Sequence, residues 1–179
     1  MAEATTGQAI DDAPASAAPW YRSKAPARLG SVKLTVATAT SVAALTALVA
    51  GGLALGKPLL IPPLAASMAL VAGAPALPLS QPRNVIGGQL LSALTGFVCL
   101  WLLGGSPWVA GLAGGLALGT MLVARCAHSP AAATAVIVVL TQPGAVSFLL
   151  LLLLATAISV LVGIVGARAG NNTYPVYWW

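Results

Sequence analysis

The chain has 179 residues, of which 59% are hydrophobic and only 6% are charged, and its formal net charge is +5. Soluble domains carry about a quarter charged residues, so this composition excludes an ordinary soluble protein and indicates a membrane domain. All three acidic residues lie within the first twelve positions, so residues 13–179 contain no carboxylate side chain.

The first 24 residues are rich in Ala, Pro, Ser and Thr, which predicts a disordered tail. The basic residues between Arg22 and Lys33 follow and are typical of an orientation signal on the cytoplasmic side. The first apolar run, Leu34–Leu55, has no charge and would reach about 33 Å as a helix, enough to cross a hydrocarbon core of about 30 Å. Prolines interrupt the second run and leave an uninterrupted helix only over Pro63–Ala74, about 18 Å long.

The third and fourth runs, Val85–Leu103 and Trp108–Ala124, are again long enough to be predicted as full spans. The fifth, Pro130–Leu140, is short, and the sixth, Ala145–Ala167, is long. Residues 169–179 form an aromatic tail suited to a membrane–water interface. We therefore predict an all-α membrane protein with four full transmembrane helices and two short broken helical segments.

The fourth run carries glycines at a spacing of four, which places small residues on one helix face: Gly111, Gly115 and Gly119. Such a face lets helix backbones approach closely in lipid. The partner is either another helix of this chain or a second copy, so a homo-oligomer through this face or another helix face is expected.

The order long, short, long occurs twice, over about 34–104 and 107–168, and suggests an internal repeat. PLAASMAL (63–70) aligns with PAAATAVI (130–137), which pairs Ser67 with Thr134, and each short helix is followed by a Gln-Pro pair. Coincidence in an alanine-rich chain is the alternative. If each half crosses the membrane an odd number of times, the halves are inverted; this places seven of the eight basic residues and both termini in the cytoplasm. If the short segments instead dip in and return, both termini are still cytoplasmic.

Short, broken hydrophobic segments at matching places in two halves indicate the binding site of a transporter. Because no carboxylate is available in this region, a cation path or an acidic proton relay is disfavoured and an anion is favoured. The side chains predicted to line a substrate path are Ser67, Gln81, Arg83, Asn84, Arg125, His128, Ser129, Thr134 and Gln142.

Each of these residues also has a structural interpretation. The arginines could reach lipid headgroups or fix topology, His128 could bond a backbone carbonyl, Asn84 could cap a helix, and the hydroxyls could bond back to their own helices. The sequence contains no Ser-His-acid set, no phosphate-binding loop and no cluster of metal ligands. An enzyme, a nucleic-acid-binding protein, a bound metal and a cofactor are therefore not expected.

Two strings, LPLSQPRNVIGGQLLSALTG (77–96) and HSPAAATAV (128–136), resemble the HPP family of integral membrane proteins. That family has a similar SPLAQPRN-type string followed by Gly-Gly, and a His-Pro-Pro motif. The resemblance covers roughly residues 30–168, so 25–168 is taken as an HPP-type transmembrane domain. Here Ser129 replaces the first proline of the motif, and Gln89 stands where a histidine is expected.

The resemblance implies a protein with four transmembrane spans, and plant members are associated with nitrite transport across chloroplast membranes. A transporter or channel for a small inorganic anion, with nitrite as the first choice, in the plasma membrane is therefore the expected function. A scaffold or sensor that transports nothing, and a channel for a neutral solute, remain the alternatives.

Overall fold

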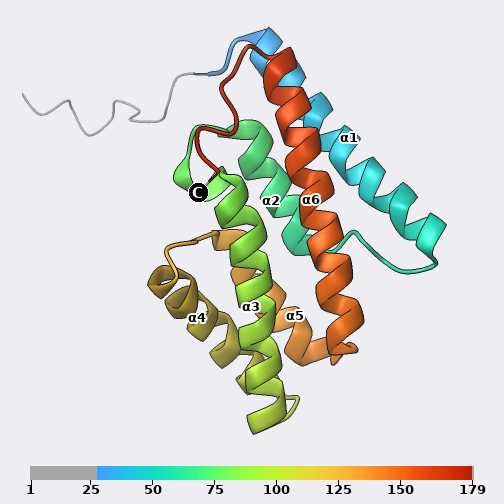
Figure 1. Cartoon of the computed structure of the whole chain (residues 1–179), viewed down its shortest axis with the longest axis vertical. Coiled ribbons are helices and arrows are strands. Elements are labelled where there is room, and N and C mark those ends of the chain that lie inside the picture. The colour runs from blue at the N-terminus through green and yellow to red at the C-terminus, as the bar shows by residue number, and fades with distance from the viewer. Residues whose placement is uncertain (1–27, 179) are drawn as a thin grey trace, which may run out of the picture.

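The computed structural model describes residues 28–178, and in this range all the regular secondary structure is helical, with no strand (Figure 1). The predicted disordered tail over residues 1–24 lies outside the described residues. The elements in chain order are α1 (Ser31–Leu55), α2 (Pro62–Gly73), η1 (Pro78–Ser80), α3 (Pro82–Leu103), α4 (Pro107–Val123), η2 (Ser129–Ala131), α5 (Ala132–Thr141) and α6 (Ala145–Ala169).

Three of these helices, α1, α3 and α6, are long and apolar enough to cross a membrane. The expected fourth span, α4, has 17 residues, or about 25 Å at 1.5 Å per residue, and falls short of a hydrocarbon core of about 30 Å. The prediction of four full spans is therefore not confirmed. The two short helices were expected, and α2 and α5 have only 12 and 10 residues.

Prolines set where the short elements begin and end. Pro62 and Pro63 open α2, and Pro82 opens α3 after an extended Gln81, because proline suits the first turn of a helix and disfavours helical backbone before it. At the other end of the second short helix, Gln142 adopts a left-handed conformation, with φ 48°, directly before Pro143. Each break thus has a local chemical cause.

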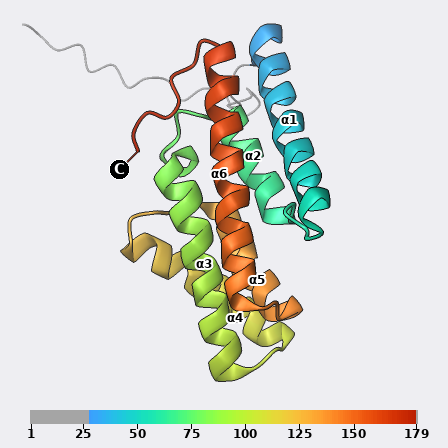
Figure 2. The ribbon, with the colours of Figure 1, turned by 45° about the vertical axis from the view of Figure 1, so that its right-hand side comes forward.

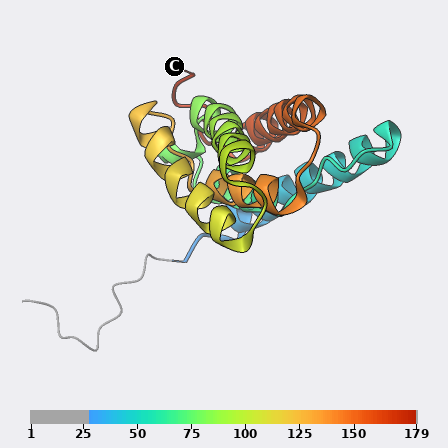
Figure 3. The same cartoon turned by 90° about the horizontal axis from the view of Figure 1, so that it is seen from below.

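Helices α3 and α6 have more buried residues than the other helices and lie side by side at the centre (Figure 3). Helix α1 packs against α2 and α6, and α4 packs against α5 and α3, so that α1 and α4 occupy opposite edges. Exchanging the first three helices for the last three leaves this list of neighbours unchanged. The start of α1 and the end of α6 lie at the same end of the bundle (Figure 2).

The two halves also share a register of 67 residues. In α3, a methyl group on Gly96 would meet Val138 of α5; in α6, one on Gly163 would meet Val71 of α2, and both pairs are related by this shift. The buried positions of α6 from 152 to 164 fall, after the same shift, on buried positions of α3. The halves run in opposite directions, since α1, α2 and α3 run down, up and down in Figure 1 while α4, α5 and α6 run up, down and up.

This register corrects one part of the alignment made from sequence. Gln81-Pro82 and Gln142-Pro143 are 61 residues apart and are not equivalent, whereas Ser67 and Thr134 are. Gln81 is fully buried before α3, while Gln142 is exposed after α5. The shared dipeptide is therefore a local helix signal in both halves and not a common position of the repeat.

The first helix of each half ends in the same way. Gly56 follows α1 with φ 61°, and Arg125 follows the last turn of α4 with φ 57°. After each, a backbone N–H donates at 3.0 Å to the carbonyl five residues earlier, on Gly52 and Met121 respectively. Glycine is the usual residue at this left-handed position, and another residue there costs roughly 1 kcal/mol, so the geometry of the turn explains the backbone of Arg125.

We predict that Gly96→Ala destabilises the protein by about 1–3 kcal/mol, because the added methyl would lie 2.8 Å from the Ala135 carbonyl oxygen, which belongs to helix backbone and cannot move aside. Gly73→Ala, at the exposed end of α2, is the matched control, since nothing lies within 4 Å of that methyl, and it should be neutral or raise stability by up to about 1 kcal/mol. Thermal unfolding in detergent measures both. Equal melting temperatures for the two variants would contradict the close packing of α3 on α5.

Candidate functional site at the meeting of the short helices

A cluster of polar side chains is buried where α2, α3 and the η2–α5 segment meet. Its members are Ser67 of α2, Gln89 of α3, His128 directly before η2, and Thr134 of α5, and each has a relative exposure of 0%. We call these four residues the central network. Because polar groups deep in a membrane protein must find partners inside it, the hydrogen bonds of the central network decide what it can do.

His128 is held through both ring nitrogens. Nδ1 lies 2.8 Å from the backbone oxygen of Leu79, which can only accept, so Nδ1 carries a proton and donates. Nε2 lies 2.7 Å from Ser67 Oγ. The ring therefore links the loop before α3 to the middle of α2, and its orientation is fixed from two sides.

Gln89 joins the two short helices. Its Nε2 donates to Ser67 Oγ at 3.0 Å, and its Oε1 accepts from the Thr134 hydroxyl. Ser67 and Thr134 are the equivalent hydroxyls of the two halves. One amide thus uses its donor on one half of the repeat and its acceptor on the other.

One glycine contact and one hydrogen bond bring α3 close to the segment that carries His128. A methyl group on Gly88 of α3 would lie 2.7 Å from His128 Cβ and 2.8 Å from the Cys126 oxygen, so only a residue without a side chain admits the loop that carries the histidine. One helical turn further, Ser92 Oγ donates to the Ala131 carbonyl and ties α3 to η2. The segment GGQLLS of α3 therefore packs closely against the second short helix and the loop before it.

The network accommodates either charge state of His128. The Ser67 hydroxyl lies 2.9 Å from the Pro63 carbonyl as well as 2.7 Å from Nε2, and it has one proton to give. With a neutral ring, the hydroxyl donates to Nε2; with a protonated ring, Nε2 donates to the hydroxyl, which turns to Pro63. Rotation of one hydroxyl is enough to exchange the two arrangements.

A second group of polar side chains closes the end of the bundle nearest η1. Gln81 is fully buried; its Nε2 donates to the carbonyls of Pro75 and Leu77 at 2.8 and 2.9 Å, and its Oε1 accepts from the Val176 N–H at 2.8 Å. Asn84, with 6% exposure, donates from Nδ2 to the Ala127 carbonyl at 2.9 Å. Both amides hold loops in place above the central network.

The remaining residues of the sequence prediction lie at the surface of the described structure. Arg83 is half-buried and reaches the Ala124 carbonyl at 3.3 Å, while Arg125, Ser129 and Gln142 are exposed. The structure thus brings together Ser67, His128 and Thr134 but does not bring the two arginines to them. Neither arginine is therefore a member of the central network, and the positively charged lining stays a prediction.

Sequence reasoning noted Gln89 only as a departure from the family pattern and did not place it in the path. The available signal was its position: it is an uncharged polar residue inside an otherwise apolar span. Such a residue must pair with something in the interior, and the nearest candidates are the hydroxyls of the two broken helices. The partners themselves depended on the packing of α3 between them.

Apolar helices, two of them short and joined by buried polar side chains, define a membrane-spanning protein built from broken helices. The chain belongs to the HPP family, since the family model of the HPP transmembrane region matches residues 24–175. The match includes every element described above.

Two transmembrane proteins of Dictyostelium discoideum are similar to this chain. One is 33% identical over 129 residues, covering 67% of this chain and 45% of the relative. The other is 36% identical over 131 residues, covering 64% of this chain and 40% of the relative. The chain therefore spans less than half the length of these relatives. No solved structure matches it.

We predict that Gln89→Leu destabilises the protein by about 1–3 kcal/mol, because it leaves the buried Thr134 hydroxyl without its amide partner and Ser67 with one partner fewer. The triple variant Ser67→Ala, Gln89→Leu, Thr134→Val removes all three groups together and should lose less than the sum of the single changes. Chemical or thermal unfolding in detergent measures this coupling. Strict additivity of the three changes would contradict the bridge.

Proposed function

We propose that this protein moves a small inorganic anion, with nitrite as the first choice, across a membrane by way of the central network. The observation that carries the proposal is the meeting of two broken helices at a buried cluster whose side chains can all donate hydrogen bonds. Broken helices that enclose polar groups in the interior are the general mark of a binding site in transporters.

The chemistry of the cluster supports an anion over a cation. Ser67, Gln89 and Thr134 each offer a donor, and His128 offers a second one when protonated. No carboxylate is present in residues 13–179 to attract a cation or to repel an anion. The N-terminal halves of α2 and α5 both contribute to the cluster, and the start of a helix carries a partial positive charge.

Nitrite fits this proposal by size and charge, since it is small, carries one charge and accepts a few hydrogen bonds. Plant proteins of the family that this chain resembles are associated with nitrite transport, which makes nitrite the first substrate to test. Proton coupling through His128 belongs to the same proposal, because its imidazole is the one ionisable side chain of the network.

In this proposal the protein lies in the plasma membrane with both termini in the cytoplasm, and α4 is a fourth, shorter transmembrane helix. The proposal also includes a homo-oligomer through the outer face of α4. Gly111, Gly115 and Gly119 are exposed there, and a methyl group on any of them would meet nothing within 4 Å among the described residues. A second copy packed on these glycines would bury this face.

We predict that purified protein in liposomes takes up nitrite and that Ser67→Ala lowers the rate at least tenfold, because the hydroxyl contacts both His128 and Gln89. Ser31→Ala, an exposed serine at the start of α1, is the matched control and should stay within twofold. Uptake is followed with an internal nitrite assay. Absence of nitrite uptake by folded wild-type protein would sink the choice of substrate, and uptake of neutral solutes alone would favour a channel of another kind.

We also predict that His128→Ala removes any dependence of nitrite uptake on pH that arises in the central network, because no other side chain of the network can ionise. The His128→Gln variant keeps a polar group at this place and should transport without pH dependence. Initial rates over a pH series measure both. A pH profile in either folded variant that matches the wild type would exclude His128 as the coupling group.

A further inference from the structure

A cavity of about 350 Å³ opens beside Lys57, on the side of the molecule opposite η1. It lies between the start of α2, the end of α5 and the start of α6, and its lining includes Lys57, Ile61, Ile137, Thr141 and Ser147. Most of the wall is apolar, with the hydroxyls and the Lys57 side chain as its polar groups. We call this space the lysine vestibule. Its lining residues Ile61 and Ile137 lie six and three residues along the chain from Ser67 and Thr134 of the central network.

The repeat register identifies the matching place in the other half. A shift of 67 residues relates Ile61 to His128, Thr141 to Ala74 and Ser147 to Ser80. In the lysine vestibule these positions surround empty space. In the other half, His128 and Ser80 are fully buried and the His128 ring lies between Ser67 and Leu79, while Ala74 lines a separate cavity between α1 and the end of α2.

Hydrogen bonds hold this second place closed. Ser80 Oγ lies 2.8 Å from the Ala74 carbonyl and 3.1 Å from the Leu70 carbonyl, the last acceptors of α2. His128 Nδ1 donates to Leu79 at 2.8 Å, and Asn84 Nδ2 donates to Ala127 at 2.9 Å. These bonds join the end of α2, the η1 loop and the loop before η2. At the lysine vestibule, the residues equivalent to His128 and Asn84 are Ile61 and Leu151, whose side chains cannot form hydrogen bonds.

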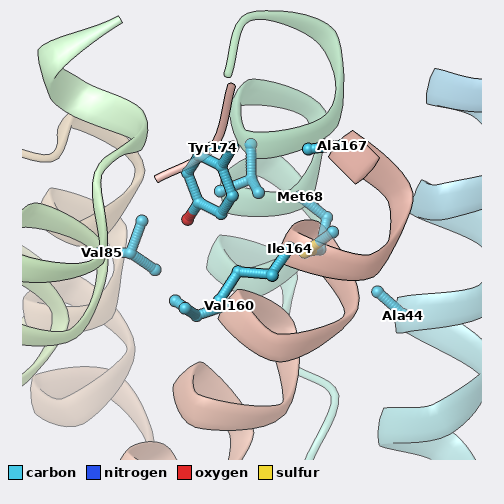
Figure 4. Packing of buried hydrophobic residues seen from close by; sticks show 8 residues of the cluster. Ala44, Met68, Val85, Val160, Ile164, Ala167 and Tyr174 are labelled. Atoms are coloured by element: carbon cyan, nitrogen blue, oxygen red, sulfur yellow. The ribbon is translucent and has the colours of Figure 1, made fainter. Parts of the chain in front are cut away.

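The segment after α6 adds a lid to the closed side. Tyr174, with 5% exposure, lies among Met68, Val85 and Ile164 in a cluster formed by four helices (Figure 4). Its hydroxyl has no hydrogen-bond partner among the described residues. The buried position of Tyr174 is therefore less stable than it would be with the hydroxyl hydrogen-bonded. The Val176 N–H binds Gln81, so the segment and the η1 loop are fastened together. The first half continues from α3 directly into α4 and has no equivalent segment.

We propose that the lysine vestibule is one of two repeat-related entrances to the central network, and that its counterpart is closed here by Ser80, Asn84, His128 and the Tyr174 segment. Opening of that counterpart exposes the buried Ser80 and His128, while the lysine vestibule closes. Lys57 is then the first positive group that an anion meets on its side. This inference rests on the proposed function for its anion, but the exchange of entrances is a property of the fold and needs no substrate to detect.

The test uses thiol accessibility in membrane vesicles. Cys99 and Cys126 are first replaced by serine, and single cysteines are then introduced at the repeat-related serines as Ser147→Cys and Ser80→Cys. A charged, membrane-impermeant methanethiosulfonate is added from either side. We expect Ser147→Cys to react from the Lys57 side, and Ser80→Cys to react at least tenfold more slowly and only from the opposite side.

The Tyr174→Ala change removes the lid and should speed the reaction of Ser80→Cys at least tenfold while slowing that of Ser147→Cys. The pair Ile137→Cys and Leu70→Cys, also repeat mates, repeats the comparison with side chains that make none of the closing bonds. Reaction of both members of a pair from one side, or rates at both closed-side positions that Tyr174→Ala leaves unchanged in folded protein, would overturn the proposal.

Nitrite uptake by the same vesicles separates the two ideas. If Tyr174→Ala changes the thiol reaction rates as expected but the vesicles take up no nitrite, the two entrances are supported and the choice of anion is wrong. Nitrite uptake with closed-side positions that never react would overturn the two entrances and leave the anion transporter standing.

Discussion

The structure depends on one primary amide that lies between the two halves of the chain. Gln89 gives a proton to Ser67 and takes one from Thr134, which are equivalent positions of the repeat. A carboxylate could only accept at both places, and an ammonium group could only donate. Because unpaired polar groups are costly in a membrane interior, this amide fixes how α2 and α5 approach α3 and where His128 must lie.

Close approach of the helices makes this bridge possible. Gly88 and Gly96 of α3, and Gly163 of α6, stand where a methyl group would collide with a short helix or its loop. Helices in lipid gain little from the hydrophobic effect on meeting one another, so their association relies on tight packing and on hydrogen bonds such as those of Gln89. The same glycines that hold the bundle together therefore bring the short helices to the polar centre.

The two halves are alike in packing and unlike in polarity. The place occupied by His128 in the second half is occupied by Ile61 in the first, and only the second half is followed by a segment that folds back over the bundle. A repeat with equal scaffolds and unequal loops can be closed at one end while it is open at the other. The loops that differ between the halves therefore make the two ends of the bundle different, although the helices pack alike.

The sequence by itself determined the helical class, the two short helices and the hydroxyl pair of the repeat, and it singled out the polar stretch around His128. Prolines and apolar run lengths act within a few residues, so they can be interpreted without knowing the fold. Only the tertiary structure decided that Gln89 joins the network, that Arg125 points to the surface, and that the Gln-Pro pairs are not equivalent. Those outcomes depend on how α3 packs between the two short helices and on a left-handed turn after α4, whereas the 67-residue register was already present in the alignment of Ser67 with Thr134.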